Sequence, residues 1–287
     1  MKFWQALSFT ETDQLVEVAR ACEEVGFHGA LVADHYFLPE KLASKYPYSE
    51  DGAPPFAGDA EFPEPFAAIS AMAAATQRLH FATGICIAPL RHPIALAKSV
   101  ATASVLSGGR TALGVGVGWI REEFDQLGQD FATRGVRLDE MIEVMRKLWA
   151  GGMAEHRGRF YAFERLQMSP PPVGQVPIYV GGGSEPALRR AARNDGWIGT
   201  GDDPARVPAI LERLRVLRKE EGRERAPFET IVALTAPPDV ALFRRLEDQG
   251  VTSIVSWPLT YALGPASSVE AKRRALEQYG SEVIARC

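Results

Sequence analysis

Two adjacent titratable residues, Asp34 and His35, directly follow the apolar run Gly29–Ala33. A histidine exchanges a proton near neutral pH, and an adjacent aspartate can fix its tautomer or bind a ring nitrogen group. If the apolar run is a strand of an α/β protein, its carboxyl end is where catalytic groups gather. The pair therefore predicts acid–base chemistry at a strand exit, with a loop cap or a salt bridge as the alternative.

A second candidate is the turn Gly181–Ser184, which reads Gly-Gly-Gly-Ser between an apolar run and a helical pattern. Gly181, Gly182 and Gly183 permit close backbone approach, and Ser184 can cap the helix that follows. Free N–H groups and the positive end of a helix attract anions. The turn therefore predicts a phosphate site, whereas its alternative is an ordinary tight turn.

The segment from Leu79 to Gly128 contains a strand, a helix and a second strand that leaves through Gly118-Trp119. Its Gly114–Gly118 run lacks the G-x-G-x-x-G register and the acidic ribose partner of a dinucleotide site, which excludes a Rossmann interpretation. Glycines here leave space beside a flat ring, with Trp119 as one wall. Simple packing against the next helix is the alternative.

The elements that must position these residues follow an alternating pattern of strands and helices. Eight β-rich runs occur, at Lys2–Ser8, Gly29–Ala33, Leu79–Ile87, Thr111–Val117, Pro177–Gly181, Gly196–Gly199, Phe228–Thr235 and Thr252–Ser256. Helical stripes separate them, and a final amphipathic helix spans Val269–Ile284. Such alternation demands a parallel sheet with right-handed crossovers. We predict one (β/α)8 TIM barrel domain over residues 1–287, with His28 and His80 at the end opposite the site.

Two segments interrupt the alternation and are expected as insertions after strands 2 and 4. They are Tyr36–Pro63 and Gly151–Val176, the latter with a short hairpin around Arg159–Glu164. Both are expected on the catalytic face, where either could cover a pocket. His156, within the second insertion, could join a basic rim for an acidic cofactor tail, although a solvated charge cluster is the simpler interpretation.

Composition narrows the function classes. The net charge of −4 and a pI near 5.8 disfavour nucleic acid and anionic membranes as partners, so a small-molecule substrate is expected. The amino-terminal residues resemble neither a signal peptide nor a membrane span, which predicts a cytoplasmic protein. Three scattered cysteines and the absence of HExxH or clustered ligands predict neither a disulfide framework nor a metal site. No GxSxG elbow is present, so cofactor chemistry remains.

Six motifs carry a family resemblance. They are Ala33-Asp-His35, Pro89-Leu-Arg-His-Pro93, Leu106-Ser-Gly-Gly-Arg110, Gly114-Val-Gly-Val-Gly-Trp119, Glu122-Glu-Phe124 and Gly181-Gly-Gly-Ser184. In order and spacing, from about Lys2 to Gly199, the chain resembles the luciferase-like monooxygenase superfamily and is most similar to its F420-dependent branch. The resemblance implies a flavin-type ring beside Asp34, His35, Ile85, Cys86, Gly118 and Trp119, with its phosphate near Gly181–Ser184.

The resemblance implies either coenzyme F420, which we favour, or FMN. F420 would make the protein a hydride-transfer oxidoreductase. FMN would make it an FMNH2-dependent monooxygenase, similar to alkanesulfonate monooxygenase and supplied by a separate cofactor reductase. A non-catalytic cofactor-binding barrel is a third hypothesis. Some F420 dehydrogenases carry a catalytic glutamate where this chain has Trp119, and Glu122 or Glu123 could replace it or face solvent.

Two further features are implied by the resemblance. Luciferase-like barrels usually pair through helices, so a homodimer is expected, with the alanine-rich faces Ala67–Ala75 and Ala95–Ala103 as candidates for close approach. Relatives often have a non-proline cis peptide at the third strand exit. In this chain the matching bond is Ile85–Cys86.

Overall fold

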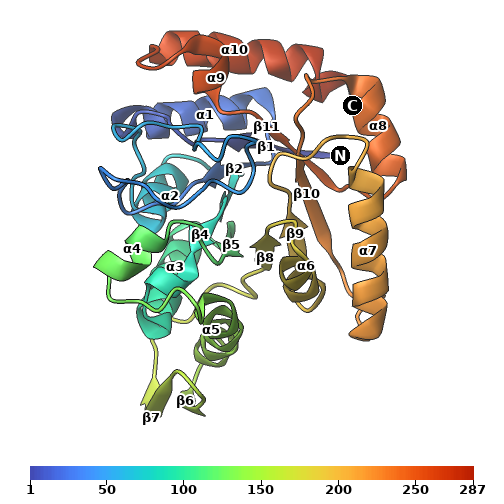
Figure 1. The fold of residues 1–287 in the computed structure, drawn as a ribbon. Helices are drawn as coiled ribbons and strands as arrows, with labels where there is room; N and C mark the ends of the chain where they lie inside the picture. The colour runs from blue at the N-terminus through green and yellow to red at the C-terminus, as the bar shows by residue number, and fades with distance from the viewer.

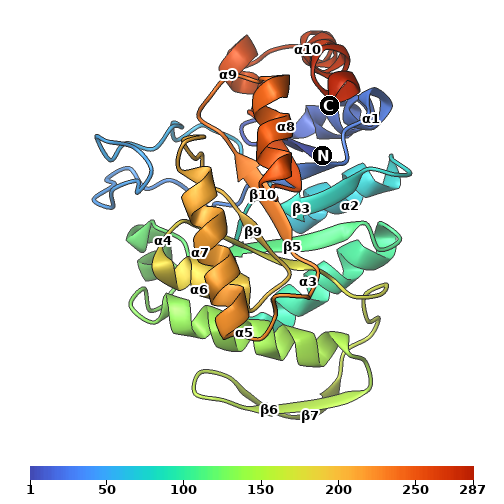
Figure 2. The same cartoon turned by 90° about the vertical axis from the view of Figure 1, so that its right-hand side faces the viewer.

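The strands of the computed structural model, which describes residues 1–287, close into a parallel barrel (Figures 1 and 2). They are β1 Lys2–Ala6, β2 Gly29–Val32, β3 His80–Thr83, β4 Cys86–Ile87, β5 Thr111–Gly116, β8 Ile178–Gly181, β9 Gly196–Ile198, β10 Glu229–Ala233 and β11 Ser253–Ser256. The pairings β1–β11 and β3–β5 close the ring, and β4 continues β3 along β5. The predicted eight-stranded TIM barrel is therefore confirmed, since β3 and β4 share one position.

Helices surround the barrel on its outer side (Figure 1). They are α1 Leu15–Val25, α2 Pro65–Ala74, α3 Pro93–Leu106, α4 Arg121–Gln126, α5 Arg134–Trp149, α6 Glu185–Ala192, α7 Val207–Glu220, α8 Val240–Asp248, α9 Leu259–Leu263 and α10 Val269–Glu282, with 3-10 turns at Thr12–Gln14, Ala88–Leu90 and Ile284–Arg286. Local sequence sets several starts: His92, Asp239 and Ser268 each cap a helix through the side chain. No helix is both long and apolar enough to cross a membrane.

Strand residues alternate between two apolar cores, as expected when successive side chains point to opposite faces. The larger core, 53 buried residues, lies between the barrel and its helices. The smaller core fills the barrel with Trp4, Ala6, Leu31, Ala82, Ala112, Ile198, Ile231 and Val255. Because side chains fill the interior, ligands have access only at its ends.

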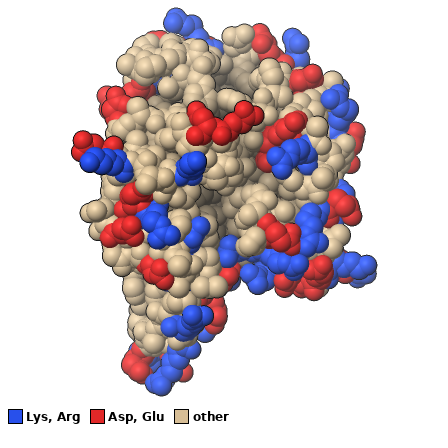
Figure 3. Space-filling model, in the orientation of Figure 1, with Lys and Arg blue, Asp and Glu red and all other residues tan.

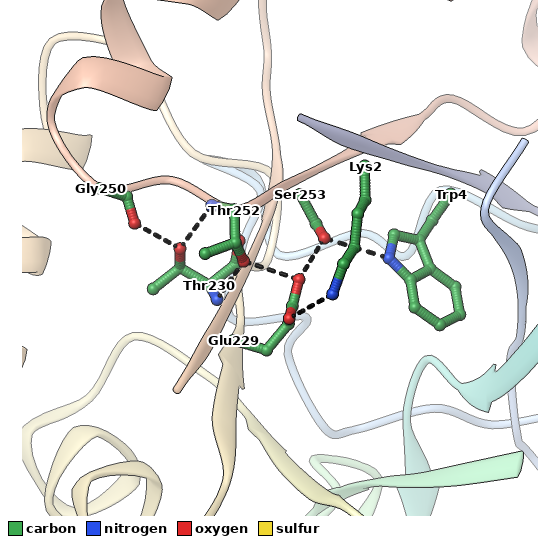
Figure 4. Close-up of polar contacts among 7 residues, drawn as sticks. All are labelled: Lys2, Trp4, Glu229, Thr230, Gly250, Thr252 and Ser253. Carbon is green, nitrogen blue, oxygen red and sulfur yellow. Dashed lines mark hydrogen bonds and ion pairs between the residues drawn. The ribbon is translucent and has the colours of Figure 1, made fainter. Parts of the chain in front are cut away.

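The amino-terminal end of the barrel, here called the floor, is closed by a polar network (Figure 4). Glu229 accepts hydrogen bonds from Thr252 at 2.7 Å, from Ser253 at 2.5 Å and from Lys2 at 2.9 Å. His28 and His80 stack nearby with their ring centroids 4.5 Å apart. His28 precedes β2 and His80 is the first residue of β3, so both lie at the floor as predicted.

The two insertions differ in position. Residues 36–63 follow β2 at the carboxyl end of the barrel, as predicted. The other insertion belongs to the fourth βα unit but follows α5 instead of its strand, so the expectation that it lies on the catalytic face is wrong. Its hairpin, β6 Met153–Arg157 and β7 Ala162–Gln167, runs along the outer side of α5 (Figure 2). His156 is buried there against Glu140 at 3.2 Å and belongs to no exposed basic rim.

Candidate active site

The carboxyl ends of the barrel strands, here called the mouth, hold His35 against a buried carboxylate. His35 Nδ1 lies 3.0 Å from Oε2 of Glu123, and the backbone N–H of Tyr36 donates to Oε1 at 2.8 Å. The Glu123 side chain has no exposure to solvent. Its helix, α4, begins directly after the exit of β5, which is how residues 88 positions apart meet. The pair fixes the His35 ring and leaves Nε2 available for a ligand.

Asp34 has a different set of partners from the one expected. It accepts hydrogen bonds from Arg91 at 2.7 and 3.0 Å and from the Ile87 backbone N–H at 2.9 Å. The carboxylate that orients His35 is therefore Glu123 and not Asp34, because Asp34 faces the exit of β4. This ion pair ties the exit of β2 to the exit of β3–β4 and fixes the chain on which Ile85 lies.

The side chains of Ile85 and Cys86 lie on opposite faces of the barrel wall. Cys86 is completely buried in the outer core, so only its backbone can face the mouth, and burial followed by the Asp34 charge raises the pKa of its thiol. Ile85 packs on the inner core. A Cβ on Gly116 would lie 2.4 Å from the nearest side-chain atom of Ile85, and for a Cβ on Gly181 this distance would be 2.7 Å. These two glycines therefore make the room that Ile85 occupies at the mouth.

The cis bond lies one residue earlier than the resemblance implies. It is Gly84–Ile85, not Ile85–Cys86. The bond lies in the break between β3, which ends at Thr83, and β4, which begins at Cys86.

Aromatic rings enclose His35. Phe62 and Phe56 lie 5.1 and 5.4 Å from the His35 ring, and Trp119 meets it edge-on at 6.1 Å. Both phenylalanines belong to the insertion 36–63, whereas Trp119 follows Gly118 at the exit of β5. Gly118 has a φ of +79° and a Cβ there would stand 2.6 Å from Ile87, so glycine is required for this turn. His35 is thus shielded on several sides by apolar surface.

The predicted glycine turn leads from β8 into α6. Gly182 has a φ of +117°, and nothing lies within 4 Å of the position of a Cβ on Gly183. The N–H groups of Gly183 and Ser184 have no acceptor within the protein. Ser184 is the N-cap residue, but its side chain makes no capping bond, contrary to the expectation. The turn therefore presents unpaired donors in open space at a helix start.

A carboxyl group that sequence reasoning missed lies beside this turn. Asp202 follows β9, and burial raises its pKa. Its charge in turn raises the pKa of Tyr48, after the larger effect of burial. The Tyr48 hydroxyl lies 3.9 Å from the position of a Cβ on Gly182. A buried acid at a ligand-facing site is a candidate functional group.

The structure thus brings the predicted residues to one end of the barrel. Asp34, His35, Ile85, Gly118, Trp119 and Gly181–Ser184 all lie at strand exits of the mouth, whereas Cys86 is turned away. Glu123, Arg91 and Asp202 complete the set. Glu122 does not reach His35, since it accepts hydrogen bonds from Ala43 and Ser44 instead. His92 is an exposed helix cap.

Comparison with known proteins identifies the family of the chain. The model of the family Luciferase-like monooxygenase matches residues 4–239. An uncharacterized protein of Mycobacterium tuberculosis is 37% identical over 288 residues, which cover 100% of both chains. The protein belongs to the luciferase-like monooxygenase family, whose members are flavin- or F420-dependent oxidoreductases.

Two relatives with assigned activities differ in cofactor. An F420-dependent glucose-6-phosphate dehydrogenase of Mycolicibacterium gilvum is 29% identical over 241 residues, 80% of this chain and 67% of its own. The oxygenase component of a flavin-dependent trigonelline monooxygenase of Acinetobacter baylyi is 29% identical over 172 residues, 58% of this chain and 42% of its own.

Solved structures share the fold at low sequence identity. The monooxygenase RslO1 from Streptomyces bottropensis superimposes with a TM-score of 0.80 at 17% identity, covering 99% of both chains. An F420-dependent secondary alcohol dehydrogenase in complex with an F420–acetone adduct gives 0.79 at 15% identity, covering 100% of this chain and 99% of its own. These likenesses establish the barrel architecture alone.

Proposed function

We propose that this protein is an F420-dependent oxidoreductase that transfers a hydride to or from a small organic substrate. The observation that carries the proposal is His35 at the mouth, held by the buried Glu123 and surrounded by aromatic rings. Hydride transfer to a carbonyl, or from an alcohol, needs a proton donor or acceptor at the oxygen. His35 is placed to serve in that role.

The residues at the mouth fit a deazaflavin or flavin. Gly183 and Ser184 offer two unpaired N–H donors to a phosphate at the start of α6, where the helix dipole also favours an anion. Glu185, the acidic residue closest to this turn, is paired with Arg213 and Arg189 and so repels an anion less. Ile85 and Trp119 supply apolar surfaces for the ring.

Each protein group has a separate task in the reaction. The deazaflavin supplies or accepts the hydride when it is bound. His35 Nε2 donates or accepts the proton, and Glu123 holds the ring in place through Nδ1. Asp34 acts one step away, because its ion pair with Arg91 and its bond to the Ile87 N–H position the segment that carries Ile85, which would contact the cofactor. The aromatic rings exclude water from His35.

F420 is favoured over FMN because the F420-dependent relative matches a longer part of this chain, 80% against 58%, at the same 29% identity. The second candidate is a reduced-FMN-dependent monooxygenase, supported by the trigonelline monooxygenase relative. In that case a separate reductase would supply the reduced cofactor.

Titration of the purified protein with oxidised F420 and with FMN, followed by absorbance, tests the proposal. We expect F420 to bind with at least tenfold greater affinity, and bound F420 to be reduced by a secondary alcohol or its reduced form to be oxidised by a carbonyl compound. Preferential binding of FMN with oxygen consumption would favour the second candidate. Binding of either cofactor without turnover across such a panel would indicate a non-catalytic barrel.

A further inference from the structure

Eight aromatic side chains and His35 form one continuous belt across the mouth. Beginning near α6 and ending beyond β11, the eight are Tyr48, Tyr46, Trp119, Phe56, Phe62, Phe9, Tyr261 and Trp257. His35 joins the two halves, because its ring contacts Trp119 on one side and Phe56 and Phe62 on the other. Neighbouring rings lie between 5.0 and 6.1 Å apart, centroid to centroid. The rings come from four strand exits, those of β1, β2, β5 and β11. Segments far apart in sequence have thus placed aromatic side chains on one surface.

The two ends of the belt are about half-exposed, and the residues between them are partly buried. Trp257 is 45% exposed, Tyr261 46% and Tyr48 49%. Exposed aromatic rings side by side are unusual on a soluble protein and mark a binding surface. The indole N–H of Trp257 already donates to the Leu234 carbonyl at 2.6 Å, so this residue offers a ligand mainly its apolar face.

The charges around the belt disfavour an anionic ligand. No belt residue carries a positive charge, and burial raises the pKa of Tyr46 to about 12 and also raises that of Tyr261. Both terminal nitrogens of Arg91 already donate to Asp34, and the charge of Arg91 is balanced by that carboxylate. Glu123, the carboxylate against His35, offers only acceptor oxygens to the centre of the belt and so cannot bind a phosphate or a carboxylate of a substrate there.

An apolar cavity continues from the far end of the belt. It measures about 300 Å³ and lies among the exits of β10 and β11 and the helices α8, α9 and α10. Trp257 and Tyr261 belong to both the belt and the cavity lining, and Phe243, Leu259 and Leu276 form part of its apolar wall. The polar and charged surface of the molecule, by contrast, has both signs interspersed (Figure 3).

We infer that the substrate is an uncharged molecule with a planar or extended apolar part, which lies on the belt with its reacting carbon near His35. A group extending past Tyr261 would enter the apolar cavity. This inference rests on the proposed oxidoreductase function and names its substrate class. It distinguishes this protein from the relative named for glucose 6-phosphate, which is a phosphorylated and strongly polar compound.

Calorimetric titration with three probes tests the inference: 2-naphthol, 2-naphthyl phosphate and glucose 6-phosphate, each added to F420-loaded and to cofactor-free protein. We expect 2-naphthol to bind the loaded protein at least tenfold more tightly than either phosphate. Tyr261→Leu should weaken 2-naphthol binding about 3- to 10-fold, the amount expected for one aromatic contact, with F420 affinity unchanged. Phe160→Leu, in the hairpin outside α5, is the matched control and should change neither affinity.

Three results would overturn the inference: tighter binding of either phosphate, displacement of 2-naphthol by F420, or unchanged 2-naphthol affinity in a folded Tyr261→Leu variant. Thermal melting of both variants establishes that they are folded. The titrations need no turnover, so the two proposals can fail separately. If the protein binds 2-naphthol through Tyr261 but performs no hydride transfer, only the proposed function is contradicted. If it turns over phosphorylated substrates alone, only the substrate class is contradicted.

Discussion

His35 and Glu123 form a partly enclosed pair, with Nδ1 and Oε2 3.0 Å apart and the carboxylate shielded completely from water. A carboxylate in that setting restricts the imidazole to one orientation, because the hydrogen bond is little weakened by competing water. The same carboxylate holds the Tyr36 backbone, so one side chain sets both the ring and the strand exit that carries it.

Removal of the imidazole should abolish most turnover without unfolding the protein. For His35→Ala we expect turnover to fall about 10²-fold or more, the usual contribution of a general acid or base, while F420 affinity changes little because the glycine turn is intact. Single-turnover kinetics, F420 titration and thermal melting on the same variant are the measurements. Glu123→Gln is the companion variant: it keeps an acceptor for Tyr36, so kcat should fall with KM nearly unchanged. Near-normal turnover in His35→Ala would remove His35 from the mechanism.

Adjacent glycines of the predicted phosphate turn should respond differently to the same substitution. Gly183→Ala should leave the melting temperature nearly unchanged and weaken cofactor binding, because its methyl group enters the open space where a phosphate is expected. Gly182→Ala should instead destabilise the fold by about 1–2 kcal/mol, since φ is +117° and a left-handed conformation is unfavourable for alanine. Melting curves and F420 titrations separate the two effects. Unchanged affinity in Gly183→Ala would argue against a phosphate at this turn.

The histidine stack at the floor predicts a stability that depends on pH. Burial, then the charges of His80 and Lys2, lowers the pKa of His28 from 6.5 to about 4. The unfolded chain therefore binds a proton at a higher pH than the folded protein does. The stability that the folded protein gains by keeping His28 neutral is fully present above about pH 6.5. It is lost as the pH falls toward about 4.

Thermal melting between pH 4 and 7.5 measures this effect. The melting temperature should fall across the acidic part of the range in the wild type and fall less in His28→Gln, which cannot be protonated. His92→Gln, an exposed helix cap, is the control that should retain the wild-type slope. If the melting temperatures of the wild type and His28→Gln fall with the same slope as the pH is lowered, His28 is not the source of the pH dependence.

The eight strands could be predicted because each is a short apolar run between helical patterns, and buried parallel strands have that composition. The sequence could not show which of Glu122 and Glu123 reaches the site, because α4 has six residues and is too short for a periodic pattern that shows which side is buried. The pairing of Asp34 with Arg91 joins residues 57 positions apart and depends on barrel closure. The expectation that the second insertion lies on the catalytic face fails because a segment that follows a helix, as this one follows α5, starts at the opposite end of the barrel.

A homodimer through α2 and α3 remains a prediction. Ala67, Ala71 and Ala74 are exposed on α2, and Leu106 is 56% exposed at the end of α3. Small residues allow two such faces to approach closely, so Ala71→Arg should convert a dimer to a monomer with little change in the melting of the individual subunit. Light scattering at micromolar concentration measures the mass. A wild-type protein that is already monomeric would contradict the prediction.

Two consecutive glutamates of α4 anchor the insertion 36–63 at separate points. Glu123 holds Tyr36, and Glu122 accepts hydrogen bonds from Ala43 and Ser44. The anchored part, residues 36–44, cannot be remodelled without moving the His35 ring. Residues 45–55, which carry Tyr46 and Tyr48, lie beyond these anchors and before Phe56, and they can be exchanged as a cassette. An engineer who wished to change what the protein accepts could therefore graft new sequence into that arc while the proton-transfer apparatus stays in place.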